Sequence, residues 1–194
     1  MKLPKEMLEW IAARGPGILA VDGRCGCGKS SLGEALAREL GASLFHMDDF
    51  YLPFARRAWN WRQLPAGNMD LERFRREVLE PTLAGQPVSY RAYRCPEDRY
   101  LAPRQIPWRP VSIVEGSYSQ HPLLADAYKT RLFVTAAPSV QEQRLLRREG
   151  EHFAAFREIW IPMEEQYFET FAIAQKADAV LHTDEEPMRL LMRE

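Results

Sequence analysis

The sequence predicts an α/β fold in which helices cover a parallel β-sheet. Short apolar runs of β-forming residues alternate along the chain with amphipathic stretches of helical period, a pattern typical of parallel strands joined by crossover helices. A glycine-rich turn joins the first apolar run to the helical stretch that follows it. The chain has 194 residues and no repeat, linker or low-complexity tract, so we expect one domain over residues 1–194.

The expected elements follow from this alternation. The five expected strands lie at residues 18–21, 43–47, 111–114, 132–135 and 179–182. The expected helices lie at residues 5–14, 30–40, 71–83 and from 139 to about 174. Gly41 and Gly85 end the second and third helices as C-terminal caps. Ser139, with Glu142 three residues later, predicts a capping box at the start of the last helix.

The charges of the chain nearly cancel, and this limits its partners. Lys and Arg together number 26 and Asp and Glu 27, which gives a formal net charge of −1. A surface that binds nucleic acid normally makes a domain basic, so we expect no nucleic acid partner. Only five of the cations are lysines, so a lysine inside a motif stands out.

The cysteines and the apolar segments indicate the compartment. Cysteines at positions 25, 27 and 95 are odd in number and lack the spacing of metal ligands. This favours a reducing environment, and we expect a cytoplasmic location. The first residues have the pattern of a short amphipathic helix rather than of a signal peptide. No apolar run approaches eighteen residues, so we expect no membrane span.

The strongest chemical signal is the segment Gly23–Ser30, which matches G-x-x-x-x-G-K-[ST] without a mismatch. It follows an expected strand and opens an expected helix, as a phosphate-binding loop must. Its glycines let backbone N–H groups turn toward phosphates, and the helix N-terminus adds partial positive charge. We expect Lys29 to contact the β and γ phosphates and the Ser30 hydroxyl to bind Mg²⁺. We take the two cysteines as loop fillers whose side chains point away. The expected nucleotide contacts are Gly23, Cys25, Gly26, Cys27, Gly28, Lys29, Ser30 and Ser31.

Acidic residues follow two of the expected strands and are candidates for catalysis. Asp48 and Asp49 follow the second strand, and Glu115 follows the third. Their carboxylates are therefore expected at the carboxyl edge of the sheet, where ligands bind in open parallel sheets. A kinase needs a carboxylate there to accept the proton of the attacking hydroxyl. Asp48 is the candidate base, whereas a turn-capping role explains Asp49 equally well. The candidate Mg²⁺ ligands are Ser30, Asp48 and Glu115.

Three arginines follow the fourth expected strand. Arg144 lies at same-face helical spacing from Arg147 and Arg148. Such a cluster could stabilise a transferring phosphoryl group. A solvated face paired with Glu142 and Glu149 explains it nearly as well.

Together these motifs resemble the uridine kinase group of P-loop kinases, which includes nicotinamide riboside kinase, pantothenate kinase and phosphoribulokinase as relatives. The matching elements are the phosphate-binding loop, Asp48-Asp49-Phe50-Tyr51, Asn68-Met69-Asp70, Glu115-Gly116 and Arg144-x-x-Arg147-Arg148. The resemblance implies a three-layer P-loop NTPase fold with a five-stranded parallel sheet of nucleoside-monophosphate-kinase type. It also implies an acceptor-binding excursion over about residues 52–108 and a lid over about residues 144–160.

The resemblance further implies roles for individual residues. Asp48 matches the catalytic aspartate of the family, Asp70 an aspartate that holds the substrate ribose, and Glu115 the acid near Mg²⁺. The expected catalytic set is Lys29, Asp48, Arg147 and Arg148, with Arg144 on the nucleotide. The expected acceptor contacts are Asp49, Tyr51, Asp70, Tyr90, Arg94 and Glu115.

The sequence departs from uridine kinases in two places. The segment after Arg148 is shorter than the family's lid. The pyrimidine-reading stretch is replaced by residues 90–95, with an arginine where the family has an aspartate and without its histidine. Phosphate chemistry therefore transfers better than uridine specificity. Arg91, Arg94 and Arg99 would suit an acceptor that carries an anionic group.

The sequence thus predicts an ATP- and Mg²⁺-dependent kinase that acts on a hydroxyl of a small, nucleoside-like metabolite. Two alternatives stay open, namely a nucleotide-binding regulator without catalysis and a kinase for an anionic acceptor that is not a nucleoside. A GTPase is disfavoured because the N-K-x-D guanine motif is absent. The oligomeric state is open, with a homodimer as one outcome.

Overall fold

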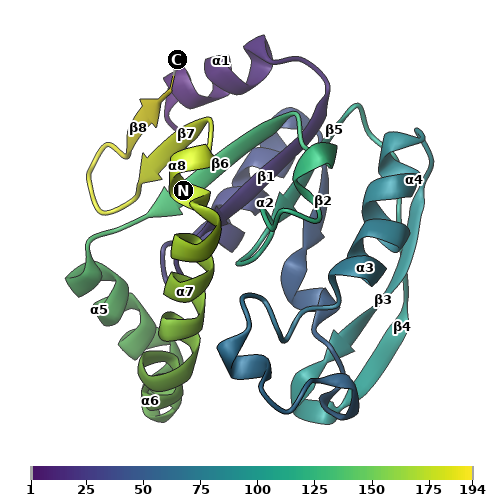
Figure 1. Cartoon of the computed structure of the whole chain (residues 1–194). Helices are drawn as coiled ribbons and strands as arrows, with labels where there is room; N and C mark the ends of the chain where they lie inside the picture. The colour runs from purple at the N-terminus through teal and green to yellow at the C-terminus, as the bar shows by residue number, and fades with distance from the viewer. Residues whose placement is uncertain (1, 194) are drawn as a thin grey trace.

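Six strands form the central sheet of the computed structural model, which describes residues 2–193. Their order is β2-β5-β1-β6-β7-β8; the first five are parallel, and β8 runs antiparallel to β7. The strands are β1 (Gly17–Gly23), β2 (Ser43–His46), β5 (Val111–Glu115), β6 (Thr130–Thr135), β7 (Ala179–His182) and β8 (Arg189–Met192). Each of the five predicted strands is present (Figure 1). The predicted count of five was wrong because it omitted β8.

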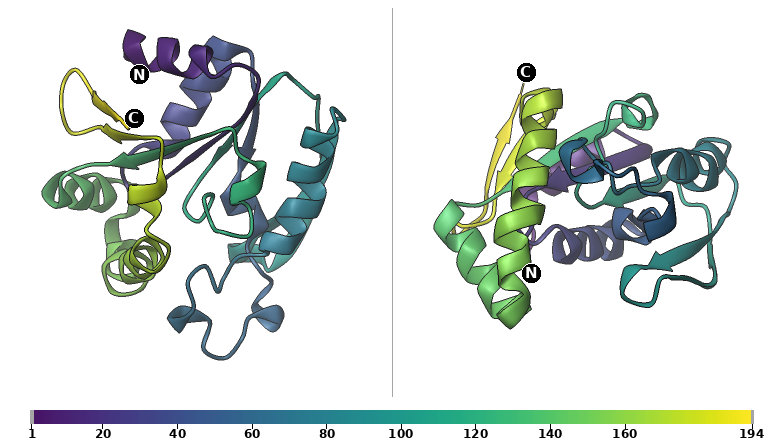
Figure 2. Two further views of the ribbon diagram at one scale, coloured as in Figure 1. Left: turned by 45° about the horizontal axis from the view of Figure 1, so that its top comes forward. Right: turned by 60° about the horizontal axis from the view of Figure 1, so that its bottom comes forward.

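Each face of the sheet has its own core, since successive side chains of a strand point to opposite faces. Leu19 and Val21 of β1 belong to the core covered by α1 (Lys5–Ala13) and α2 (Lys29–Leu40). Ile18 belongs to the opposite core, which is covered by α3 (Leu71–Phe74), α7 (Ile161–Phe171) and α8 (Ile173–Lys176). Figure 2 shows α1 and α2 on one side of the sheet and α7 on the other. The predicted layers of helix, sheet and helix are therefore confirmed.

The predicted helix over residues 71–83 is continuous but not regular. It consists of α3, a π-helical turn at Arg75–Leu79 and α4 (Glu80–Leu83). Pro81 lacks an N–H group and cannot continue the ladder of helical hydrogen bonds. The chain reverses after α4 at Gly85, whose φ is +73°.

The last helical region is divided, whereas the sequence pattern predicted one long stretch. It contains α5 (Pro138–Glu149), a 3₁₀ turn (Gly150–His152), α6 (Phe153–Ala155), a π turn (Phe156–Trp160), α7 and α8. The predicted capping box was wrong. The α5 helix begins at Pro138, and no side chain caps it. The N–H of Ala137 instead donates to the Asp184 carboxylate at 3.0 Å.

A two-stranded antiparallel hairpin, β3 (Val88–Arg94) and β4 (Arg99–Ile106), was not predicted. Its strands lie beside α3 and α4, away from the central sheet (Figure 1). Val88, Tyr90 and Ala92 are buried against that helical segment, and the residues between them are exposed. This period-two pattern was visible in the sequence, but the many arginines and prolines of the region obscured it.

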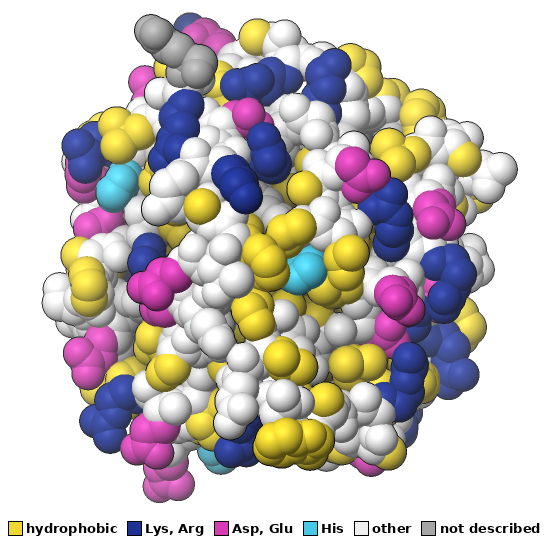
Figure 3. All heavy atoms as spheres, viewed as in Figure 1, with side chains coloured by type: hydrophobic (Ala, Val, Ile, Leu, Met, Phe, Trp, Pro, Cys, Tyr) yellow, Lys and Arg dark blue, Asp and Glu magenta, His cyan; other side chains and the backbone are white. Residues whose placement is uncertain are grey.

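The surface carries charges of both signs. Lys and Arg side chains are interspersed with Asp and Glu on the face shown in Figure 3, as expected for a chain with a net charge of −1. Among residues 2–193, no helix is both long enough and apolar enough to span a membrane.

Candidate active site

A cavity of about 380 Å³ lies where β1, β2 and β5 end. This is the carboxyl edge of the sheet, where open α/β sheets bind their ligands. The phosphate-binding loop forms one wall of the cavity, and the irregular segment after β2 forms another. The third wall comes from residues 148–164, which run from the end of α5 into the first part of α7.

The phosphate-binding loop has the context that the motif predicts, directly between β1 and α2. Gly23 cannot carry a side chain, because a Cβ atom there would lie 1.9 Å from the carbonyl oxygen of Val134. Gly28 precedes α2 with a φ of +87°, a conformation that favours glycine. The loop can therefore turn tightly and still place Gly26, Gly28 and Lys29 on the cavity wall.

Lys29 is buried, and its ammonium group donates to the carbonyl oxygens of Gly23 at 2.6 Å and Arg24 at 3.0 Å. Burial alone lowers the pKa of Lys29, but the negative charges of Glu164 and Asp22 more than offset this, and the net shift is upward. The side chain is therefore a permanent cation at neutral pH.

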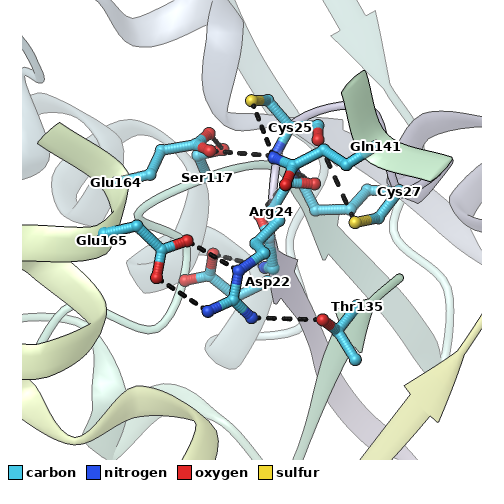
Figure 4. Close-up of polar contacts among 11 residues, drawn as sticks. Asp22, Arg24, Cys25, Cys27, Ser117, Thr135, Gln141, Glu164 and Glu165 are labelled. Atoms are coloured by element: carbon cyan, nitrogen blue, oxygen red, sulfur yellow. Dashed lines mark hydrogen bonds and ion pairs between the residues drawn. The ribbon is translucent and has the colours of Figure 1, made fainter. Parts of the chain in front are cut away.

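Glu164 of α7 is a site residue that the sequence did not indicate (Figure 4). Its Oε2 accepts a hydrogen bond from the loop N–H of Cys25 at 2.9 Å, and its Oε1 accepts one from the Ser117 hydroxyl. The next residue, Glu165, accepts from Arg24 at 2.6 Å and 2.7 Å. The loop amide of Cys25 therefore donates to an anionic group of the protein itself. No motif marks Glu164, since it lies in a helix 139 residues from Cys25.

Asp22, the penultimate residue of β1, was also missed. Its carboxylate is fully buried and accepts hydrogen bonds from the N–H groups of Gly23 (2.7 Å) and Gln120 (2.9 Å) and from the Tyr167 hydroxyl (2.8 Å). Burial raises the pKa of Asp22 to about 6, although these hydrogen bonds and Lys29 oppose the shift. An acid at the end of an apolar run was a signal that could have found it.

Asp48 lines the cavity from the 3₁₀ turn Met47–Phe50, directly after β2. Its Oδ1 accepts a hydrogen bond from the Tyr51 hydroxyl at 2.9 Å. Desolvation raises the pKa of Asp48; the hydrogen bond from Tyr51 opposes this, and the negative charge of Glu115 adds to it. The carboxylate is thus held in place and is more basic than that of a solvated aspartate.

Glu115 lies opposite Ser30, and the two are candidates for holding a cation. Its Oε2 accepts from the Ser30 hydroxyl at 3.2 Å, and its Oε1 lies 2.5 Å from Nδ1 of His46. The hydrogen bond to Glu115 raises the pKa of His46, a residue that the sequence did not indicate. Mg²⁺ usually takes one or two protein oxygens and completes its shell with water and phosphate, so this pair fits it. Residues 2–193 hold no cluster of three or more His, Cys, Asp or Glu that could bind a metal alone.

The three predicted arginines separate in the structure. Arg148 lines the cavity. Arg147 is exposed and lies outside it. Arg144 donates to the hydroxyl and carbonyl oxygens of Thr183 at 2.9 Å and 2.7 Å, and the Thr183 hydroxyl donates to the Cys27 carbonyl at 2.9 Å. Arg144 therefore supports the phosphate-binding loop from outside the cavity.

The predicted acceptor contacts also separate. Asp49 accepts from the Tyr90 hydroxyl at 2.7 Å and pairs with Arg104 at 2.5 Å. Asp70 caps α3 and pairs with Arg56 at 2.9 Å. The predicted residues that line the cavity are Cys25, Gly26, Gly28, Lys29, Ser30, Ser31, Asp48, Tyr51, Glu115 and Arg148. Those that do not line it are Gly23, Cys27, Asp49, Asp70, Tyr90, Arg94, Arg144 and Arg147.

The two loop cysteines differ in position. Cys27 is fully buried in the core beneath α2, as expected for a filler that points away, whereas Cys25 lines the cavity. Burial raises the pKa of Cys27 to about 11 and that of Cys25 further. Both thiols are therefore protonated and poorly reactive at neutral pH.

Comparison with known proteins places this site within a known fold. No family model matches the sequence, and no curated protein matches it. Among solved structures, a protein from Bacillus stearothermophilus described as a possible uridine kinase is 21% identical, covers 90% of this chain and 93% of its own, and has a TM-score of 0.67. A protein from Silicibacter sp. TM1040 described as a putative fructose transport system kinase is 21% identical, with coverages of 85% and 93% and a TM-score of 0.70.

A third similar structure is a gluconokinase from Sinorhizobium meliloti, which is 20% identical, with coverages of 89% and 85% and a TM-score of 0.51. At these identities the likeness establishes the fold. The chain therefore has the same fold as these solved structures, and its Gly23–Ser30 loop lies at the carboxyl edge of the sheet.

Proposed function

We propose that this protein is an ATP- and Mg²⁺-dependent phosphotransferase that phosphorylates a hydroxyl group of a small metabolite. One observation carries the proposal: Lys29 of the phosphate-binding loop and the carboxylate of Asp48 line the same cavity. The first group binds phosphate and the second can accept a proton, which are the two functions that a small-molecule kinase combines. The fold shared with solved kinases supports the same conclusion.

Each side chain of the cavity then has a defined task. ATP supplies the phosphoryl group, and Mg²⁺ offsets its negative charge. Lys29 and the loop N–H groups bind phosphate oxygens, and Ser30 and Glu115 hold the metal ion. Asp48 orients the acceptor hydroxyl and accepts its proton, a role that its raised pKa favours.

The segment over about residues 144–160 acts as the lid in this proposal. Arg148, Phe156 and Trp160 line the cavity from it. Arg148 balances charge on the transferring group, and the two aromatic side chains restrict the access of water. Arg144 takes a supporting role, since it is bound to Thr183 behind the loop.

A nucleoside-like acceptor is the proposal that follows from the resemblance to uridine kinases. The three solved structures compared above are described as a possible uridine kinase, a putative fructose transport system kinase and a gluconokinase. The compounds in these descriptions are small and carry hydroxyl groups. However, Asp70, the residue matched to the ribose contact, is paired with Arg56 and does not line the cavity. The alternative of an anionic acceptor therefore gains weight. The three free cysteines fit the proposed cytoplasmic location.

The proposal is tested by measuring ADP release from ATP and Mg²⁺ in the presence of candidate acceptors. The set comprises nucleosides, nucleoside monophosphates, pantothenate, nicotinamide riboside, sugars and sugar acids. At least one acceptor is expected to stimulate ADP release, and Lys29→Ala is expected to lose most of the stimulation. If ATP binds but no acceptor stimulates its turnover, the protein is a nucleotide-binding regulator instead.

A further inference from the structure

Two polar side chains of the cavity have no task in the phosphate chemistry. Asn68 and Arg57 belong to the irregular segment that follows β2, and both line the cavity together with Asp48 and Tyr51. They belong to the excursion between β2 and β5, which was expected to bind the acceptor.

Asn68 is 1% exposed, yet its side-chain Oδ1 has no hydrogen-bond partner among residues 2–193. Its main chain is fixed, because its carbonyl oxygen accepts from the N–H of Leu52 at 2.8 Å. Buried polar atoms without partners are rare in proteins and usually mark a place where a ligand or water binds. An amide offers one acceptor and two donors, so it can pair with a sugar-type hydroxyl in either sense.

Arg57 is a half-buried cation without an acidic partner among residues 2–193. It donates to the Leu52 carbonyl oxygen at 3.0 Å and to the Cys95 sulfur at 3.4 Å. The rings of Phe54 and Trp61 lie 4.3 Å and 5.0 Å from its guanidinium carbon. The neighbouring Arg56, in contrast, pairs with Asp70. Arg57 is therefore held in one position with its charge uncompensated, which is the arrangement that binds an anion.

The arginines that the sequence suggested for an anionic group are engaged elsewhere. Arg91 donates to main-chain carbonyl groups of β4. Arg94 and Arg99 both pair with Glu97 at the end of the β3–β4 hairpin. None of the three lines the cavity, whereas Arg57 does, so Arg57 takes their place as the cation of the irregular segment after β2.

We propose that Asn68 and Arg57 bind the acceptor, and that the acceptor is a small polyhydroxy compound bearing a carboxylate or phosphate group. This inference rests on the proposed kinase function. Asp48 takes the proton of one hydroxyl, Asn68 pairs with another, and Arg57 pairs with the anionic end. The cation is needed there because Asp48, Glu115 and Glu164 line the same cavity and would repel an anion. The cavity of about 380 Å³ also includes the phosphate-binding loop, so the acceptor is small.

The test uses acceptor sets that differ only in the terminal group: glycerol, glycerate and glycerol 3-phosphate, and glucitol, gluconate and glucitol 6-phosphate. ADP formation is measured with ATP and Mg²⁺, and binding of each compound is measured by calorimetry. The kcat/KM of an anionic member is expected to exceed that of its neutral counterpart by about tenfold or more, because a hydrogen bond between charged groups stabilises a complex more than one between neutral groups. Comparison of the carboxylates with the phosphates identifies which anion Arg57 prefers.

Variants then assign the preference to the two residues. Arg57→Gln is expected to raise the KM for the anionic acceptor by roughly 10- to 100-fold while the KM for ATP stays within about twofold. Arg56→Gln is the matched control and is expected to keep the preference. Asn68→Leu, which keeps the branched shape of the side chain and removes its polar atoms, is expected to raise the acceptor KM for neutral and anionic members alike.

The outcomes separate this inference from the kinase proposal. ADP formation with neutral members alone, or an equal effect of Arg57→Gln on neutral and anionic members, overturns the anionic class and leaves the kinase proposal intact. Absence of both binding and turnover with every anionic compound also overturns it. If no acceptor stimulates ADP formation, neither in the set listed under the proposed function nor in the sets listed here, the kinase proposal is overturned as well.

Discussion

The proposed donor and acceptor sides of the cavity are built in different ways. The donor side is a run of consecutive residues, Gly23–Ser31, held between a buried strand and a helix. The acceptor side combines Asp48, Tyr51, Arg57 and Asn68 from a chain segment composed of short 3₁₀ turns and irregular backbone. A run of consecutive residues can be recognised in the sequence from its spacing. The residues of the irregular segment come together on the cavity wall only after the segment has packed against the rest of the protein.

The two sides are joined through the proposed lid. The ring of Trp61, from the acceptor side, lies 5.9 Å from the ring of Trp160, and the Gln166 amide donates to the Gln63 carbonyl at 3.0 Å. The α7 helix, which follows the proposed lid, also reaches the phosphate-binding loop, since Glu164 accepts a hydrogen bond from the Cys25 amide. Substitutions on each side can therefore test whether donor binding and acceptor chemistry are separable.

The largest effect is expected on the acceptor side, from Asp48→Asn. Removal of the base is expected to lower kcat by about 10²- to 10⁴-fold and to leave ATP binding unchanged. Steady-state kinetics and equilibrium binding of ATP check both expectations. Asp49→Asn is the matched control, because Asp49 pairs with Arg104 and does not line the cavity. Full turnover by Asp48→Asn would remove Asp48 from the mechanism.

On the donor side, Lys29→Ala is expected to lower kcat/KM for ATP by about 10²- to 10³-fold, as the loss of a preorganised charge does. Unlike the Asp48 variant, it should weaken nucleotide binding as well, which calorimetry with ATP and Mg²⁺ measures. Lys5→Ala serves as a control, since Lys5 is exposed on α1. Equal kinetics of the Lys29 variant and the wild type would contradict the proposed donor site.

The buried Asp22 beneath the donor side is expected to make stability depend on pH. Its folded-state pKa of about 6 lies above its ordinary value of 3.8, so the folded protein holds more protons than the unfolded chain between these values. The contribution of Asp22 to the free energy of unfolding therefore decreases as pH rises from about 4 to 6, by about 3 kcal/mol for a shift of roughly two units.

Denaturant unfolding at several pH values checks this expectation. The difference in the free energy of unfolding between the wild type and Asp22→Asn should fall across that pH range and be constant above about pH 7, where Asp22 is ionised in both states. Parallel curves for the two proteins over the whole range would show that Asp22 does not carry the raised pKa.

The smallest effect is expected where α7 meets the phosphate-binding loop. Glu164→Gln removes a negative charge that lies on a loop amide, so ATP is expected to bind about tenfold more tightly. Calorimetry with ATP and Mg²⁺ measures the change, and Glu158→Gln, an exposed residue of the same region, is the control. Unchanged or weaker ATP binding would mean that the Glu164 carboxylate does not compete with phosphate.

Much of the fold could be predicted because its signals are local. The five parallel strands are short apolar runs, and α2 follows its glycine-rich turn directly. β8 and the β3–β4 hairpin were missed for a different reason. β4 contains Pro103 and is mostly exposed, so its sequence lacks an apolar pattern, and β8 is a short edge strand. Such strands are defined by the partner they pair with rather than by their own composition.

The site could be predicted only in part. The strand-end positions of Asp48 and Glu115 placed both on the cavity wall as expected, since carboxyl ends of parallel strands share one edge. Asp49 and Asp70 are also aspartates and were also predicted to contact the acceptor. In the structure, however, Asp70 pairs with Arg56 and Asp49 pairs with Arg104. Whether a carboxylate lines the cavity or pairs with an arginine outside it depends on side chains brought in from elsewhere in the chain.

The sequence by itself determined the α/β class, the phosphate-binding loop and the strand-end acids, because each rests on spacing between neighbouring residues. Only the tertiary structure decided that Glu164 binds the loop and that Asn68 and Arg57, rather than Asp70, line the acceptor side. These contacts join segments far apart in the chain. Their formation depends on how helices and irregular segments pack against the sheet, and residue spacing carries no signal for it.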